Sequence, residues 1–323
     1  DHTLTVPPVI WLVFSGAVLG FLALDLGVFH RKPRAVAFGE ALMWTTIWFS
    51  MAMAFAFWLA PVMIGEQWKD SHRTLFITGY VVELSLSMDN VFVIALIFTY
   101  FRVPLEYQHR VLFWGILGAL VMRGVMILSG AELIERFHWI MYVFGAFLLF
   151  TGIKMLFAGD EEVEPEKNIV IRLARKIYPI TTEYDGQHFF TLLNGRRALT
   201  PLALCLIMVE TTDLIFAVDS IPAIFGITTE AFIVFTSNVF AILGLRSLYF
   251  VLVGLLRHFR YLKHGMALVL VFIGFKMLVV LWEGHPAWLN FEGNHDAVLG
   301  IIGAILGLSI VASVLAPEGT GKE

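Results

Sequence analysis

The chain is a series of long apolar runs separated by shorter polar segments. A membrane-spanning helix needs about 20 mostly apolar residues, and this pattern predicts about nine of them. Their expected bounds are 9–29, 41–64, 75–100, 111–130, 139–157, 199–224, 232–256, 264–282 and 297–316. The pattern therefore predicts an all-α polytopic membrane protein.

Short motifs that occur twice in the same order predict an internal repeat of three helices. The run FTGIKML at 150–156 returns as FIGFKML at 272–278, and Arg123 in ILGALVMRG corresponds to Arg246 in AILGLRS. A unit with an odd number of spans inserts the second time in the opposite orientation, as in transporters whose substrate sites lie where two inverted repeats meet. Duplicated packing without transport is the alternative.

The repeat divides the chain into five expected parts. These are two N-terminal helices (1–70), the first three-helix repeat (71–158), a cytoplasmic loop (159–198), the second three-helix repeat (199–283), and a C-terminal helix with its tail (284–323). In the loop, NIVIRLARKIY predicts an amphipathic helix on the inner leaflet. The sequence HFFTLLNGRRALT predicts a β-hairpin that turns at Asn194–Gly195.

Basic residues outside the spans are unequally distributed between the two sides. Fifteen of them fall in loops on one side, against Lys69, Arg73 and Arg136 on the other. Because cytoplasmic loops carry the excess of Lys and Arg, we expect the N-terminus outside and the C-terminus in the cytoplasm, in a bacterial inner membrane. Lys154 and Lys276 lie inside spans near helix ends, and we expect them to extend their amino groups to the interface.

Composition agrees with a membrane protein. The chain is 59% hydrophobic and 15% charged, with a net charge of −4, which gives no sign of a nucleic-acid partner. The single cysteine, Cys205, lies in an apolar run and excludes an intrachain disulfide or a cage of several thiolates. We expect it to be a small core residue.

Two of the predicted spans contain acidic residues. Glu83 and Asp89 lie six residues apart in one, and Asp213 and Asp219 occupy the matching positions of the other, with Glu210 one helical turn earlier. An ionised side chain at the bilayer centre costs about 2.5–3.5 kcal/mol on the insertion scale, and such residues usually mark ion pathways. The acids therefore predict a buried cation site.

The spacing of these acids predicts interrupted helices. Six residues rotate an ideal helix by about 600°, so Glu83 and Asp89 would point about 120° apart. Both can face one site if the helix unwinds near them. Pro222, just after Asp219, cannot donate to the carbonyl of Val218, and a freed carbonyl is a natural oxygen ligand. We therefore expect a broken helix at the acids.

The available ligands favour a hard divalent ion. Carboxylate, amide and hydroxyl oxygens suit Mn²⁺, Mg²⁺ or Ca²⁺, and a thioether from Met88 would favour Mn²⁺ among these. The five acids exceed the two buried counter-charges, Arg123 and Arg246, by three charges, which one divalent ion and one proton would balance. Alternatively, the arginines hold the acids in a static network.

The motifs ELSLSMDN, FGAFLLFTGIKM, ETTDLIFAVDSIPAIF and SNVFAILGLRS resemble those of the TerC family of integral membrane proteins. The resemblance extends from the second expected span to the eighth. It implies the three-plus-three inverted arrangement of LysE-type transporters and an association with manganese efflux from the bacterial cytoplasm. By resemblance, the metal-pathway positions would be Glu83, Asp89, Asn90, Glu210, Asp213, Asp219 and Ser220.

Together these observations predict a transporter, not an enzyme, that exports Mn²⁺ in exchange for protons through a carboxylate-lined site between two repeats. Ca²⁺ or Mg²⁺ as the cargo stays open, as does a homo-oligomer. One alternative is a membrane interaction protein that delivers metal to secreted enzymes or to the export machinery. Another is an intramembrane hydrolase that uses paired acids to activate water, but no paired nucleophile and base are evident.

Overall fold

The computed structural model describes residues 4–24, 37–157, 168–193, 195–253, 261–280 and 294–315. Within these ranges, eight helices are long and apolar enough to cross a membrane. The expectation of an all-α polytopic membrane protein is therefore confirmed. The first expected span corresponds to the shorter apolar helix α1 (Pro8–Leu24), and the rest of that span lies outside the described residues.

The spanning helices follow the predicted order. They are α2 (Phe38–Ala54), continued by η2 (Phe55–Leu59), α3 (Ala60–Ile64) and η3 (Gly65–Gln67), then α4 (Asp70–Phe101), α5 (Leu105–Arg136), α6 (Ile140–Phe157), α8 (Pro201–Phe225), α9 (Ala231–Val253), α10 (Leu262–Val280) and α11 (His295–Leu315).

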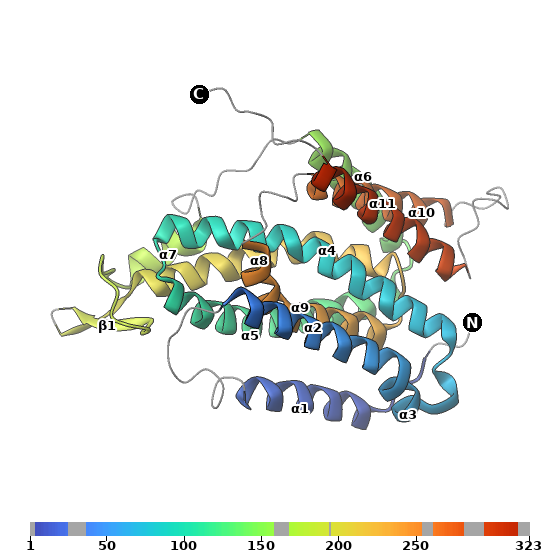
Figure 1. The fold of residues 1–323 in the computed structure, drawn as a ribbon, viewed down its shortest axis with the longest axis horizontal. Coiled ribbons are helices and arrows are strands. Elements are labelled where there is room, and N and C mark those ends of the chain that lie inside the picture. The colour runs from blue at the N-terminus through green and yellow to red at the C-terminus, as the bar shows by residue number, and fades with distance from the viewer. Residues whose placement is uncertain are drawn as a thin grey trace.

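Four long helices, α4, α5, α8 and α9, form the centre of the molecule (Figure 1). Helix α9 is buried along most of its length, since α4, α5 and α2 all pack on it. Helices α1 and α2 cover one side through a cluster of aromatic rings that includes Phe14, Phe55 and Phe232. Helices α6, α10 and α11 lie on the opposite side (Figure 1).

Helices α6 and α10, which carry the matched FTGIKML and FIGFKML motifs, cross antiparallel at close range. A Cβ at Gly152 would lie 2.9 Å from the carbonyl oxygen of Ala267, and one at Gly274 would lie 2.8 Å from that of Gly145. Small residues allow such backbone contact between membrane helices. The contact is reciprocal in the predicted repeat. Gly152 matches Gly274, and Ala267, which Gly152 meets, matches Gly145, which Gly274 meets.

The other two matched pairs also run antiparallel. Along α5 and α9, His109 lies beside Arg246 and Arg123 beside Asn238, so the numbers rise on one helix and fall on the other. Along α4 and α8, Asn90 contacts Asp213, whereas the earlier Glu83 lies near the later Ser220. Antiparallel pairing is what an inverted repeat requires; the repeat itself stays a prediction.

The two acidic helices are continuous, so the expectation of broken helices is wrong. Helix α4 runs through Glu83 and Asp89, and α8 runs through Asp219 and Pro222. Pro222 lies in the last turn of α8, where few hydrogen bonds remain to be lost, and the helix ends at Phe225. Glu83 and Asp89 therefore keep their different directions and enter different surroundings.

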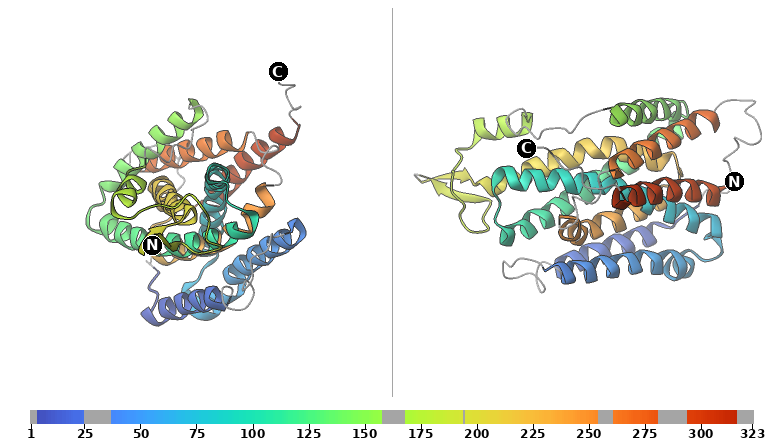
Figure 2. Two further views of the ribbon diagram at one scale, coloured as in Figure 1. Left: turned by 90° about the vertical axis from the view of Figure 1, so that its left-hand side faces the viewer. Right: turned by 45° about the horizontal axis from the view of Figure 1, so that its top comes forward.

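The loop before α8 contains one helix and one hairpin. Helix α7 (Ile169–Ile177) is capped by the Asn168 side chain and buries Ile171 in the cluster that contains Cys205. Strands β1 (Phe190–Leu193) and β2 (Arg196–Leu199) pair antiparallel around a turn in which Gly195 has a φ of +76°. The hairpin extends beyond the ends of the helices (Figure 2). The acidic run at 160–166 lies outside the described residues.

A tyrosine fastens this loop to the bundle. The hydroxyl of Tyr184 donates to the carbonyl oxygen of Phe101, at the end of α4, over 2.6 Å. Burial raises the pKa of Tyr184 to about 12, so the hydroxyl keeps its proton throughout the physiological range. Arg110 lies over the ring of Phe189 and adds a second contact between α5 and the loop.

Candidate functional site

Arg123 of α5 is the centre of a buried ionic network. Only 2% of the arginine is exposed. Its Nη1 contacts the carboxylate of Glu83 on α4, and its Nη2 lies 3.0 Å from Oδ1 of Asp213 on α8. Buried charges are tolerated when they are paired and hydrogen-bonded. Arg123 is therefore a cation shared by the two acids that occupy matching positions in the predicted repeat.

Neutral side chains complete this network. Asn238 of α9 donates to Glu83 over 3.2 Å, and Asn90 of α4 donates to Asp213 over 3.4 Å. Arg123 also donates to the Ser220 hydroxyl and to the Asn238 side-chain oxygen, both over 3.3 Å. Asn238 is absent from the residues proposed from the sequence, although it belongs to the SNVFAILGLRS motif. This is the arrangement that the static-network alternative describes for Glu83 and Asp213.

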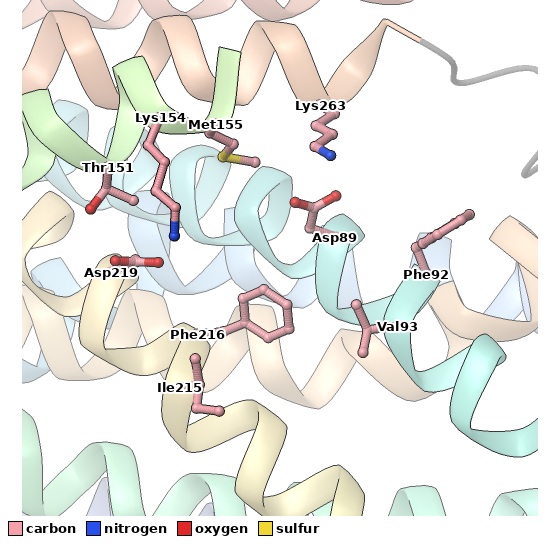
Figure 3. A pocket seen from close by; sticks show the side chains of 10 residues that line it. All are labelled: Asp89, Phe92, Val93, Thr151, Lys154, Met155, Ile215, Phe216, Asp219 and Lys263. Carbon is pink, nitrogen blue, oxygen red and sulfur yellow. The ribbon is translucent and has the colours of Figure 1, made fainter. Parts of the chain in front are cut away.

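Asp89 and Asp219 face cavities beside the network. A cavity of about 40 Å³, which has room for a few water molecules, lies between α4 and α8. It adjoins a larger cavity of about 250 Å³ (Figure 3). The residues that line both are Asp89, Met155, Phe216 and Asp219, and the smaller one also reaches Glu83, Asn90 and Ser220.

Two lysines line the larger cavity, opposite the two acids. In Figure 3 the amino group of Lys154 on α6 points toward Asp219, and that of Lys263 on α10 points toward Asp89. Lys154 was expected to extend to the membrane interface, and Lys263 to lie in a loop. The antiparallel crossing of α6 and α10 instead turns both toward the cavity. Lys276, also expected at the interface, is buried and donates to the Gly226 carbonyl oxygen over 3.0 Å.

A thioether also lies at the cavity, but from another methionine than expected. Met155 of α6 lines both cavities between Asp89 and Asp219 (Figure 3). Met88 packs against the hydrophobic clusters of the bundle. Its place next to Asp89 in the sequence puts it on another side of α4, since neighbours along a helix point about 100° apart.

The remaining two proposed residues lie elsewhere. The carboxylate of Glu210 packs directly on Gly118 of α5, at a point where any larger residue would overlap it. Nη1 of Arg246 lies 3.4 Å from Nε2 of His109, near the start of α5. Arg123 contacts two carboxylates, whereas the contact described for Arg246 is with a histidine. The equivalence of the two arginines in the repeat therefore stays a prediction.

The structure thus divides the predicted acidic site into two parts. Glu83 and Asp213 belong to the Arg123 network, and Asp89 and Asp219 line the adjoining cavities. In the part of the chain that the structure describes, no three His, Cys, Asp or Glu side chains are grouped so as to hold a metal ion. The role of the seven proposed residues in metal binding stays a prediction.

Comparison with known proteins agrees with the motifs. The family described as "Integral membrane protein TerC family" matches residues 68–320. An uncharacterized membrane protein of Myxococcus xanthus is 49% identical over 95% of this chain and 92% of its own length. A protein of Escherichia coli (strain K12), named "Putative membrane-bound redox modulator Alx", is 47% identical over 94% of each chain. No solved structure matches. The chain therefore belongs to the TerC family of integral membrane proteins.

Proposed function

We propose that this protein is a membrane transporter that moves Mn²⁺ out of the cytoplasm in exchange for protons. One observation carries the proposal. Asp89 and Asp219, which occupy matching positions on two antiparallel helices, line the same pair of adjoining cavities. Two matched acids that face one cavity within spanning helices are costly in a membrane unless cations neutralise them, and they usually mark an ion pathway.

The other side chains at the cavity support manganese as the cargo. Asn90 and Ser220 add amide and hydroxyl oxygens next to the two aspartates, which suits any hard divalent ion. The Met155 thioether is a poor ligand for Mg²⁺ or Ca²⁺ but is acceptable to the softer Mn²⁺. The mixed donor set therefore favours Mn²⁺ among the three candidate ions.

Exchange for protons follows from the chemistry of carboxylate ligands. A carboxylate binds a metal ion only in its deprotonated form, so metal entry releases protons and proton entry releases metal. A site with two aspartates can therefore carry Mn²⁺ in one direction and protons in the other. An inward proton gradient would then drive the metal outward.

The direct test is Mn²⁺ flux in proteoliposomes that contain the purified protein alone. With an acidic interior and Mn²⁺ outside, we expect uptake, reported by a trapped manganese-sensitive dye, and loss of uptake when the pH gradient is abolished. Asp89→Asn and Asp219→Asn should each reduce uptake about tenfold or more, because each removes a ligand charge. Asp70→Asn, an exposed change on the same helix α4, is the matched control.

Flux without partners also separates transport from metal delivery. A protein that only hands metal to secreted enzymes or to the export machinery would bind Mn²⁺ but move none across vesicles. If both aspartate variants took up Mn²⁺ as fast as wild type, the two aspartates would not form the transport site. Uptake of Ca²⁺ in preference to Mn²⁺ would identify Ca²⁺ as the cargo.

The name of the Escherichia coli relative raises a redox role as a second candidate. A dithiol–disulfide couple needs two cysteines, and this chain has one. Cys205 of α8 is fully buried in a cluster that also contains Ile171 of α7, and it lines neither of the two cavities. Nothing at the site therefore favours thiol chemistry over ion transport.

A further inference from the structure

We propose that Lys154 and Lys263 are tethered counter-cations that neutralise Asp219 and Asp89 when no metal is bound, so that the cargo ion must displace both ammonium groups. This inference rests on the proposed function and deepens it. It assigns a role to two residues that lie outside the acidic motifs and that the sequence did not place at the site.

The pairing crosses between helices in a consistent way. Lys154 on α6 points toward Asp219 on α8, and Lys263 on α10 points toward Asp89 on α4 (Figure 3). Both lysines thus come from the α6–α10 pair, and both acids come from the central helices. All four side chains line one cavity of about 250 Å³, within which an ammonium group on a flexible stem can change position.

The two aspartates have balanced charge in both states. With no metal bound, two ammonium groups balance the two carboxylates, and with metal bound one divalent ion does. The displaced ammonium groups keep their two positive charges, so they must move away from the ion on their flexible stems. Since an uncompensated charge in a membrane is costly, cargo entry is coupled to this movement of the lysines.

Lysine suits this role better than arginine. Its ammonium is a compact point charge that leaves a carboxylate readily, whereas a guanidinium binds carboxylate through two parallel hydrogen bonds and holds it. The chain uses both: Arg123 contacts Glu83 and Asp213 in the buried network, and lysines face the two aspartates at the cavity. The acids paired with arginine thus keep their cation, and the acids faced by lysines can exchange theirs.

The location of the lysines also couples binding to the packing of helices. Helices α6 and α10 are joined by close glycine contacts, so they form one unit against α4 and α8. While the lysines neutralise the aspartates, they attach this unit to the central helices. Displacement by the cargo releases that attachment.

The test is Mn²⁺ binding to the purified full-length protein, measured as the loss of the electron paramagnetic resonance signal of free Mn²⁺. We expect the double variant Lys154→Met/Lys263→Met to bind Mn²⁺ at least tenfold more tightly than wild type and to release it more slowly in liposome flux. The matched control is Lys276→Met, which removes the repeat partner of Lys154 from a site beside Gly226 and should leave Mn²⁺ affinity unchanged.

A charge-conserving variant keeps the test decisive if the methionine variant fails to fold. Lys154→Arg/Lys263→Arg should bind Mn²⁺ more weakly than wild type, because arginine holds the carboxylates more firmly. Unchanged affinity in the folded methionine or arginine variants, with normal binding by wild type, would overturn this inference and leave Mn²⁺ transport standing. Absence of Mn²⁺ binding by wild type would instead remove the proposed function itself, and this inference with it.

Discussion

A single arginine decides which acids at the centre of this protein are available to an ion. Arg123 pairs with Glu83 and Asp213, so these two carboxylates already share one cation, whereas Asp89 and Asp219 face a cavity. A metal ion at the cavity could recruit Glu83 and Asp213 only if the guanidinium moved. At the residue scale, Arg123 is therefore a structural cation, and the exchangeable charges lie one turn or more away along the same helices.

Replacement of Arg123 by Met should destabilise the protein strongly. The change leaves the carboxylates of Glu83 and Asp213 buried without their cation, and breaking a buried ion pair in this way costs about 3–5 kcal/mol. Thermal unfolding in detergent measures the effect. Arg136→Met is the matched control on the same helix, because its exposed bridge to Glu132 should contribute little. Equal melting temperatures for both variants would show that the network does not stabilise the fold.

The sequence shows which residues are unusual but not which of them meet. The acids and Arg123 are conspicuous because charge is rare in spanning helices, so the polar centre could be predicted. Asn238, Lys154, Lys263 and Met155 could not be assigned, since their roles depend on which faces of α6, α9 and α10 turn toward α4 and α8. Hydropathy does not determine the rotation of a helix about its own axis.

Among the elements, the crossing of α6 and α10 depends most directly on sequence. Gly274→Ala should destabilise this pair, because the new Cβ would lie 2.8 Å from two backbone atoms, the Gly145 oxygen and the Leu149 nitrogen. Backbone cannot yield as a side chain does, so we expect a cost of about 1–3 kcal/mol. Gly303→Ala in α11 meets nothing within 4 Å and is the control. A melting temperature for Gly274→Ala at or above that of the control would contradict the close crossing.

Helix continuity shows where sequence reasoning about elements failed. The spacing of Glu83 and Asp89 indicated an interruption only on the assumption that both face one site. Helix α4 is instead regular, and its two acids serve the network and the cavity separately. The proline misled in the same direction: Pro222 was expected to break the helix, but it lies so near the end of α8 that it interrupts nothing.

The loop attachment gives a prediction outside the membrane. Tyr184→Phe removes the hydrogen bond to the Phe101 carbonyl, which should weaken loop docking by about 1 kcal/mol. Hydrogen–deuterium exchange should then rise in residues 178–193 with no change in α4 below its last turn. Because the pKa of Tyr184 is about 12, docking in wild type should not vary between about pH 6 and pH 9. The bond would be lost only as the pH rises through that value.

For the whole molecule, proton exchange predicts a pH dependence of known sign. Lowering the pH from about 8 to about 6 should weaken apparent Mn²⁺ affinity, by up to about tenfold per pH unit for each proton that the metal displaces. Since loop docking is constant in this range, the change would belong to the cavity. Equilibrium Mn²⁺ binding to purified protein at a series of pH values measures it, and a flat profile would exclude proton–metal competition.

The overall arrangement was predictable in outline because membranes restrict the choices. Long apolar runs must be helices, and three matched motifs require three matched helices. The structure adds that each matched pair lies in contact and antiparallel, which no hydropathy profile contains. The orientation of the termini, inferred from basic loops, stays a prediction.

The sequence positions of the Arg123 partners also set the order of events during synthesis. Glu83 and Arg123 are 40 residues apart and belong to consecutive helices, whereas Arg123 and Asp213 are 90 residues apart. Membrane helices leave the ribosome in chain order, and an unpaired charge in the bilayer is costly. Helices α4 and α5 should therefore enter the lipid as a joined hairpin with their ion pair already formed. Arg123 should then pair with its second carboxylate, Asp213, only after the ribosome has synthesised α8.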